Sequence, residues 1–385
     1  MYQAVMETFG WALAAVALAG AGYALLAAIL AGRFRQTGAM LAPAQAVPVT
    51  ILKPLHGDEP GLAANLETFF RQDYPGPVQI VFGAHDKDDP ALGVVRALIA
   101  RYPGHDVSVV ADPALYGSNG KVSNLINMMP AVRHDTLVLA DSDIAVPQNW
   151  LALVVEALSR PGVGVVTCFY TGAPAPGVNR LWSSLAAMGT SYDFLPNALV
   201  GTSLGLAAPC FGSTIALTRA ALDRAGGFAA FADLLADDYE IGRAVREQGL
   251  GLAIPALGVA HAAAEDSLGE LVRHELRWTR TIRTINPAGH LGSFVTHGFA
   301  FALMAAILLD FAPITLGLLG LTLAARLFLK YRIDAIFGAK SGSAWMLPLR
   351  DLMTFGIFAM SLFGETVHWR GSRFEVGAAG AMTQS

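Results

Sequence analysis

The chain has 385 residues, of which 54% are hydrophobic and only 15% are charged. Soluble domains average about 25% charged residues, so part of this chain either enters a membrane or forms an unusually apolar core. The formal net charge of −4 lacks the basic excess that nucleic-acid binding favours, and we expect no nucleic-acid partner. Two cysteines, Cys168 and Cys210, are too few for a disulfide framework and predict buried free thiols in a reducing compartment.

Residues 9–32 form an apolar run without a single charged side chain. The run is longer than the ~20 residues that a helix needs to span a bilayer. A cleaved signal peptide is the alternative, but its apolar region would be shorter, and Glu7 precedes this run in place of a basic patch. We therefore predict a retained transmembrane helix. Arg33 and Arg35 follow it, so the positive-inside rule predicts a cytoplasmic domain on a bacterial-type inner membrane.

A second membrane region is predicted over residues 294–365, with two to three helices in a multi-pass arrangement. From Phe294 to Leu329 the chain is almost uncharged and is broken at Asp310 and Pro313, which suits two short spans joined by a turn. A third segment, 345–363, contains Arg350 and Asp351. These two charges fit pairing within the protein, snorkelling toward the headgroups, or a segment that lies on the surface.

Residues 45–290 are predicted to form an α/β domain between these membrane segments. Apolar runs at 47–54, 78–86, 107–112, 136–143 and 163–169 are typical of strands, and helical spacing separates them, as at 62–70 and 92–99. Strands that alternate with helices indicate a mostly parallel sheet with covered faces. Ligands bind beyond the carboxyl ends of such strands. The weakly charged stretch 178–210 fits either interfacial helices that guide a lipid or ordinary core helices.

Acidic side chains follow two of the predicted strands, at the edge where a ligand would bind. Asp86 follows the second strand together with Asp88 and Asp89, and Asp141 and Asp143 follow the fourth. Two carboxylates at that edge suit Mg²⁺ or Mn²⁺ bound to a diphosphate, whose departure a Lewis acid would assist. In isolation, the D-S-D pattern is equally typical of a turn at the end of a strand.

Three further features of the sequence indicate chemistry. Asp237 and Asp238 begin a predicted helix, where they either cap it or supply a general base for an acceptor hydroxyl. Arg277 and Trp278 precede the second membrane region and fit either an interfacial surface or a clamp for a leaving diphosphate. Lys121 is a candidate for phosphate binding, although a lone lysine is usually a surface residue.

The order of these motifs resembles glycosyltransferase family 21, which includes ceramide glucosyltransferases and bacterial hopanoid-biosynthesis glycosyltransferases. An acid cluster, D-x-D, D-D-Y and R-W follow one another in a domain bracketed by spans. Shorter matching stretches are KPLHG (53–57), QDYP (72–75), DDP (88–90), KVSNL (121–125) and ADDY (236–239). The runs PCFGST (209–214) and GGF (226–228) are most similar to the hopanoid branch.

This resemblance implies a GT-A nucleotide-diphosphosugar fold and an inverting transfer from a UDP-sugar to a membrane lipid. Glucose or N-acetylglucosamine would pass to a hopanoid polyol such as bacteriohopanetetrol, or to ceramide. The implied roles are uracil contact for Asp86, donor diphosphate contact for Asp141, metal binding for Asp141 with Asp143, proton removal by Asp238, and donor binding through the R-W pair Arg277 and Trp278. His274 stands at the first position of this motif, where the family pattern has Gln or Arg, and the resemblance implies a role in donor binding for it as well.

Other classes of protein fit part of the pattern. A processive polysaccharide synthase shares the acidic and R-W motifs but generally has more membrane spans for its polymer channel. A non-catalytic membrane scaffold with a degenerate site would retain the architecture without turnover. A metal-dependent nucleotidyltransferase would use D-x-D but needs neither the spans nor the R-W pair. Sugar transfer to a lipid is the prediction that accounts for all of these features together.

Overall fold

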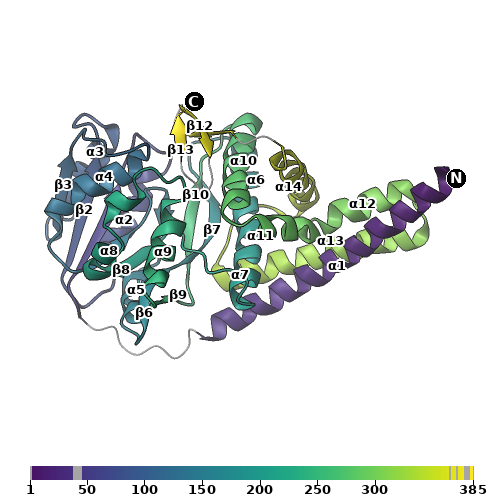
Figure 1. Cartoon of the computed structure of the whole chain (residues 1–385), viewed down its shortest axis with the longest axis horizontal. Coiled ribbons are helices and arrows are strands. Elements are labelled where there is room, and N and C mark those ends of the chain that lie inside the picture. Colours follow the sequence, from purple (N-terminus) through teal and green to yellow (C-terminus); the bar gives the residue numbers. More distant parts are fainter. Residues whose placement is uncertain (1, 38–45, 364–365, 370–371, 377–381, 385) are drawn as a thin grey trace.

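A computed structural model describes residues 2–37, 46–363, 366–369, 372–376 and 382–384. A globular α/β part is joined to a long helical arm, and the N-terminal end lies at the far tip of that arm (Figure 1). The arm consists of α1 (Tyr2–Thr37), α12 (Gly298–Leu308) and α13 (Pro313–Phe337). Segments from the two ends of the chain therefore pack together beside the domain that lies between them.

The main sheet of the globular part is mostly parallel, and one strand runs against its neighbours. β8 pairs antiparallel with both β4 and β6, whereas β1 pairs parallel with β2 and β4. The seven strands that the structure describes in this sheet are, in spatial order, β3 (Asp106–Ala111), β2 (Val78–Ala84), β1 (Val49–Pro54), β4 (Thr136–Leu139), β8 (Ile215–Thr218), β6 (Val163–Thr167) and β9 (Gly251–Ala253). The predicted mostly parallel α/β sheet is confirmed.

Helices cover both faces of this sheet. Ile51 packs into one hydrophobic cluster and its neighbour Leu52 into the other, because successive side chains of a strand point to opposite faces. Burial on both faces explains why the strands appear in the sequence as continuous apolar runs. The first face carries α2 (Leu62–Phe70), α3 (Pro90–Arg101) and α5 (Trp150–Leu158), and the second carries α4 (Gly120–Met128), α8 (Arg219–Arg224) and α9 (Asp237–Glu247).

A second, smaller sheet adjoins the main one next to the D-S-D motif. Its strands are β5 (Ile144–Ala145), β10 (Gly258–Ala263) and β7 (Phe169–Pro174), in the spatial order β5-β10-β7. The predicted strand 163–169 is divided at Cys168, where the chain leaves β6 in the main sheet and continues as β7 in the small sheet. Cys168 and Cys210 are both buried free thiols.

The stretch 178–210 consists mainly of core helices. It contains α6 (Arg180–Gly189), the π-helical turn η2 (Thr190–Phe194) and α7 (Leu195–Ser203). α6 packs on β7 and α7 packs on α1, so this stretch connects the small sheet to the arm. Large apolar side chains of this stretch are exposed near its start at Leu181 and at its end at Leu204 and Leu206. Of the two alternatives, interfacial helices or ordinary core helices, the second describes α6, most of whose residues are buried.

Among the described residues, α1 and α13 are long and apolar enough to cross a membrane. α12 forms a bent pair with the segment Pro287–Thr296, at an angle of 56°, and would provide a third span if the pair crosses as one unit. That segment comprises α11 (Pro287–Gly292) and η4 (Ser293–Thr296). Asp310 and Phe311 adopt positive φ angles of 48° and 53° in the turn that joins α12 to α13.

The charged segment 345–363 forms α14 (Leu347–Ser361), which is too short to be counted among these candidate spans. Arg350 is 2% exposed and Asp351 is 7% exposed, and both form ion pairs within the protein. Of the three alternatives, pairing is the one that the structure shows. The remaining elements are α10 (Leu268–Ile285), η1 (Met129–Ala131), η3 (Phe228–Phe231), η5 (Ala344–Met346), β11 (Thr366–Trp369), β12 (Ser372–Val376) and β13 (Met382–Gln384).

The arm depends on a close approach of α1 and α12 at two glycines. A Cβ atom on Gly20 would lie 2.7 Å from both Gly298 Cα and the carbonyl oxygen of Val295, whereas a Cβ on Gly22 would meet nothing within 4 Å. Small residues let helix backbones come this close within membranes. Gly20→Leu is expected to lower the free energy of unfolding by about 1–3 kcal/mol, because the side chain overpacks the contact.

Thermal unfolding in detergent measures this effect, with Gly22→Leu as the matched control on the same helix. The control changes helix propensity equally but adds its side chain in open space. Equal unfolding temperatures for the two variants would contradict the close contact between α1 and α12.

Candidate active site

The D-S-D motif lies in a turn at the carboxyl end of β4, where the two sheets meet. The Asp141 amide donates to the carbonyl oxygen of Gly212 at 3.1 Å, and the Ile144 amide donates back to the carbonyl oxygen of Asp141 at 3.3 Å. The motif is therefore both a strand-end turn and part of the ligand-binding edge of the sheet. Its two carboxylates face different partners, one toward α4 and α9 and the other toward β10.

Lys121 connects the D-S-D motif to the D-D-Y motif. Its Nζ lies 2.7 Å from Asp141 Oδ1 and 3.2 Å from Asp237 Oδ2. Asn119 caps α4 two residues before this lysine, and the side-chain Nδ2 of Asn119 donates to Asp237 Oδ1 at 3.3 Å. Burial disfavours the ammonium charge, but the acidic neighbours Asp141, Asp237 and Asp238 together raise the pKa of Lys121 above its usual value. Lys121 is thus a mostly covered residue of the site, with its side chain 14% exposed, and not a surface lysine.

Asp238 is a carboxylate held in place by backbone donors. Its Oδ2 accepts a hydrogen bond from the Gly212 amide at 2.8 Å, and its Oδ1 accepts one from the Tyr239 amide at 2.8 Å. Burial and the negative charge of Asp237 raise the pKa of Asp238 to about 6, while Lys121 acts in the opposite direction. This carboxylate is accordingly ionised at neutral pH and still basic enough to accept a proton.

Gly212 is the point where the two motifs come together. A Cβ atom at this position would lie 2.4 Å from Asp141 Oδ2 and 3.2 Å from Lys121 Nζ. Any side chain here would displace either the carboxylate or the ammonium group. Because residue 212 is a glycine, its backbone can hydrogen-bond both motifs: its carbonyl oxygen accepts from the Asp141 amide, and its amide donates to Asp238.

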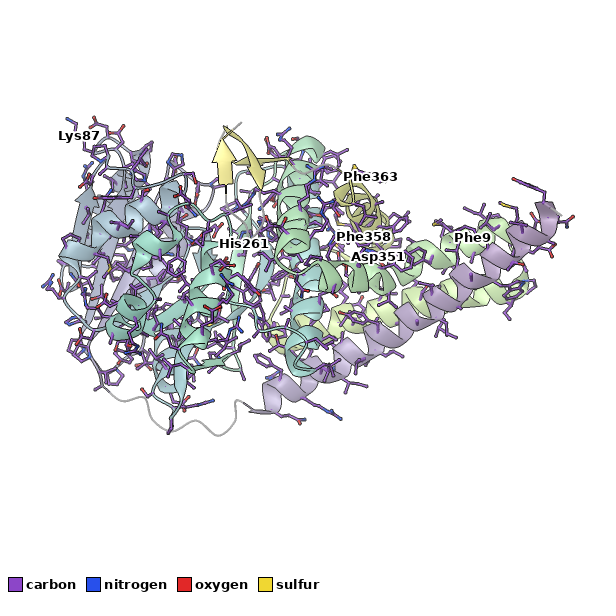
Figure 2. All side chains as sticks on the ribbon, viewed as in Figure 1. Phe9, Lys87, His261, Asp351, Phe358 and Phe363 are labelled. Carbon is purple, nitrogen blue, oxygen red and sulfur yellow. The ribbon has the colours of Figure 1, made fainter. Side chains whose placement is uncertain are left out.

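Asp143 pairs with a histidine that the sequence analysis did not select. Asp143 Oδ2 lies 3.2 Å from His261 Nε2 on β10, and Figure 2 shows His261 inside the globular part. Burial opposes the charge of Asp143, but His261 and Lys53 lower the pKa of this carboxyl to about 2. His261 is one polar residue within the apolar alternation of β10, and no local motif distinguishes it.

Lys53 is a second residue of this site that the sequence analysis named only within KPLHG. It is completely buried, and its Nζ donates to the carbonyl oxygen of Asp141 and lies 3.9 Å from the centre of the Phe69 ring. Burial lowers the pKa of Lys53 to about 7, against the opposing effect of Asp141 and Asp143. The D-S-D motif is thus flanked by two lysines, one contacting its backbone and the other its side chain.

The motif on α10 contributes a histidine and a tryptophan to the same edge. His274 Nδ1 hydrogen-bonds Glu265, and its ring lies 4.6 Å from the Trp278 ring in a T-shaped contact. Trp278 also contacts the His261 ring at 5.6 Å and the Tyr170 ring at 6.4 Å. His274 therefore orients the tryptophan beside the partner of Asp143.

Arg277 lies close enough to Tyr170 for its charge to affect the hydroxyl group of that residue. The buried hydroxyl of Tyr170 experiences the charges of Asp238, Asp143 and Asp141 together with that of Arg277. Burial and the three carboxylates raise the pKa of this hydroxyl, and the guanidinium opposes them. Tyr170 is thus close to residues of all three motifs, D-x-D, D-D-Y and R-W.

Asp86 is separate from this cluster. It is exposed in the turn after β2, where its Oδ1 accepts from the Asp88 amide at 2.9 Å. Asp89 caps α3 and also accepts from the Gly57 amide at 3.0 Å. The structure places Asp86 at the same sheet edge, two strands away from Asp141, and shows no direct contact between them among the described residues.

The residues of the D-S-D motif fit a divalent metal held jointly with a ligand. Asp143 Oδ1 is buried and has no hydrogen-bond partner, and hard carboxylate oxygens are the donors that Mg²⁺ and Mn²⁺ prefer. No group of three His, Cys, Asp or Glu side chains in the described part of the chain is arranged to hold a metal alone. The remaining ligands would have to come from a diphosphate and water.

Comparisons with known proteins agree with this geometry. A family model described as "Glycosyl transferase family 21" matches residues 11–382. Ceramide glucosyltransferase 1 from Caenorhabditis elegans is 25% identical over 350 residues, which cover 88% of this chain and 73% of the relative. A ceramide glucosyltransferase from Komagataella phaffii is 33% identical over 132 residues, covering 33% of this chain and 26% of the relative.

One solved structure establishes the fold. A mannosyltransferase from Pyrobaculum calidifontis, in complex with GDP-Man and Mn²⁺, superposes with a TM-score of 0.54 at 20% sequence identity. The match covers 93% of this chain and 99% of the mannosyltransferase. It confirms the GT-A glycosyltransferase fold, and the family model confirms the resemblance that the motifs indicate. The chain therefore belongs to glycosyl transferase family 21 and is a glycosyltransferase.

Proposed function

We propose that this enzyme transfers glucose or N-acetylglucosamine from a UDP-sugar to a hydroxyl group of a membrane lipid, with inversion at the anomeric carbon. The acceptor is either a hopanoid polyol such as bacteriohopanetetrol or a ceramide, the substrate class named in the relatives. The observation that carries the proposal is Asp238, a half-buried carboxylate with a pKa of about 6 that two backbone amides hold in place, beside the Lys121–Asp141 ion pair.

The reaction is a single displacement in which Asp238 is the general base. Asp238 removes the proton from the lipid hydroxyl as the hydroxyl oxygen forms a bond to the anomeric carbon. The bond from that carbon to the diphosphate oxygen breaks, and UDP departs with both electrons of the bond. A carboxylate with a pKa near 6 is mostly ionised at neutral pH, so the base is ready without a further proton transfer.

Positive groups around the acids stabilise the departing UDP. Arg277 supplies a guanidinium that matches phosphate geometry, and Lys121 supplies a compact ammonium beside Asp141. A Mg²⁺ or Mn²⁺ ion held by Asp141 and Asp143 supplies further positive charge for the diphosphate when it is bound. Asp86, at the same sheet edge, is assigned to the uracil end of the donor.

The apolar arm supports a lipid as the acceptor. α1 and α13 have the length and composition of membrane spans, so the α/β domain stays close to a bilayer. Tyr170, Phe194 and Phe211 form a group of ring contacts with Trp278 near Asp238. Such an apolar wall suits a lipid that presents one hydroxyl to the base. We place the domain on the cytoplasmic face of an inner membrane.

Asp238→Asn tests the role of the base. Asparagine keeps the shape but cannot accept the proton, so kcat is expected to fall by at least about 100-fold while UDP binding is retained. Transfer from radiolabelled UDP-glucose and UDP-N-acetylglucosamine measures kcat, and mass spectrometry identifies the lipid product. Asp223→Asn, at an exposed position of α8, is the control. Near-normal transfer by a folded, UDP-binding Asp238→Asn variant would remove Asp238 from the base role.

The pH dependence of the reaction tests the environment of the same residue. Only ionised Asp238 accepts a proton, so kcat/KM is expected to fall about tenfold per pH unit below about pH 6. Asp237→Asn removes a negative neighbour that raises the pKa of Asp238, so this acid limb should move to lower pH. An acid limb that stays in place in Asp237→Asn would mean that another group controls it.

Metal binding distinguishes the two acids of the D-S-D motif. Mn²⁺ titrated into the UDP-bound protein, followed by electron paramagnetic resonance, is expected to bind more than about tenfold more weakly to Asp141→Asn. Asp143→Asn should weaken binding as well, because Asp143 Oδ1 is a buried oxygen without a hydrogen-bond partner. Unchanged Mn²⁺ affinity in both variants would refute the assignment of the motif as the metal site.

A further inference from the structure

A buried cluster of charged residues connects the α/β domain to the C-terminal helices. Arg350 of α14 lies between two acids: its Nη1 and Nη2 are each 2.7 Å from an oxygen of Glu275, and its Nε is 3.2 Å from Asp193 Oδ2. Arg326 of α13 lies 2.6 Å from Asp193 Oδ1 and 2.7 Å from Asp351 Oδ1. The proposed reaction uses none of these residues.

The pair between Arg350 and Glu275 has a fixed geometry. Two parallel hydrogen bonds join the planar guanidinium to the carboxylate, an arrangement that lysine cannot reproduce. α6 leaves room for the pair at Gly189, where a Cβ atom would lie 2.4 Å from Arg350 Nη2 and 3.0 Å from Glu275 Oε1. Three helices therefore meet at this ion pair, and the backbone is shaped to accommodate it.

Glu275 belongs to the same helix as the proposed diphosphate clamp. It precedes Arg277 by two residues and Trp278 by three on α10. Because a helix turns 100° per residue, Arg277 points about 200° away from Glu275 around the helix axis. Holding Glu275 on one side thus fixes the rotation at which α10 presents Arg277 on the other.

The second acid bound by Arg350, Asp193, is also linked to Trp278. Asp193 is followed by Phe194, whose ring lies 6.1 Å from the Trp278 ring and 5.4 Å from the Phe211 ring. One guanidinium accordingly ties together the segment that carries Phe194 and the helix that carries Trp278. Its remaining hydrogen bond goes to the carbonyl oxygen of Leu185 on α6, at 3.2 Å.

We propose that Arg350 is a positioning residue for sugar transfer. Through Glu275 it sets the rotation of α10 and so places Arg277 and Trp278 against the diphosphate of the donor. Through Asp193 it holds the neighbouring residue Phe194 in contact with Trp278 of that helix. α14 then serves as part of the frame of the donor site. This inference rests on the proposed function, because it assigns the positioned residues to a UDP-sugar.

Arg350→Lys is the first test, because it keeps the charge and removes the paired hydrogen bonds. The dissociation constant of UDP, measured by calorimetry in detergent, and the KM of the UDP-sugar are each expected to rise at least about tenfold. Arg273→Lys, the same substitution at an exposed position of α10, is the matched control and should leave these values as in the wild type.

The double variant Glu275→Leu with Arg350→Met separates positioning from stability. Removing both partners leaves neither of these charges buried alone, so the fold is expected to persist, as the unfolding temperature will show. Donor affinity should still fall as in Arg350→Lys. Gly189→Ala provides a third perturbation, since it crowds the guanidinium without changing any charge.

The outcomes distinguish this inference from the function on which it rests. Wild-type protein that neither binds UDP nor transfers a sugar would overturn the proposed function and, with it, the positioning role. Wild-type protein that does both, alongside a folded double variant with unchanged donor affinity, would overturn the positioning role alone.

Discussion

The candidate active site depends on holding four carboxylates close together at one sheet edge without making the domain unstable. Asp141, Asp143, Asp237 and Asp238 would repel one another strongly if they stood alone in a low-dielectric environment. Lys121 offsets three of them, since it pairs with Asp141 and Asp237 and lowers the pKa of Asp238. The unequal distribution of cations is what makes the acids different: Asp143 has a pKa of about 2, whereas that of Asp238 is about 6. One cluster thereby contains a carboxylate that stays charged and, in Asp238, a carboxylate that can accept a proton near neutral pH.

The sequence predicted the parts of the site that lie close to recognisable elements. Asp141 follows a continuous apolar strand, so the topology of a parallel sheet is enough to place it at the carboxyl edge. Asp238 was selected because paired acids begin an amphipathic helix, and the structure brings it to the same edge through Gly212. β8 was missed because its four residues, 215–218, carry too short a pattern to indicate a strand or its direction. His261 was missed because a histidine in an apolar strand is usually a core residue, and its partner is 118 positions away in Asp143.

The charged residues of segment 345–363 also have partners that are distant in the sequence. Arg350 and Asp351 could not be assigned from the sequence because their partners, Glu275 and Arg326, lie on other helices. Local hydropathy shows that such charges are unusual, but only tertiary contacts decide whether they pair or reach the surface. Here each is satisfied inside the protein, and Figure 2 shows Asp351 on α14 beside the helical arm.

Through these ion pairs the C-terminal helices also stabilise the α/β domain. Replacing Arg326 and Arg350 by apolar residues would keep the helices in place but leave Asp193 and Glu275 without the cations that neutralise them. Leaving a buried charge without its partner typically costs about 3–5 kcal/mol, which is a large share of the stability of a single domain. Because Glu275 stands on the helix that carries Arg277, that loss would fall on the donor site itself. The C-terminal helices α13 and α14 and the proposed diphosphate clamp are therefore parts of one folded unit.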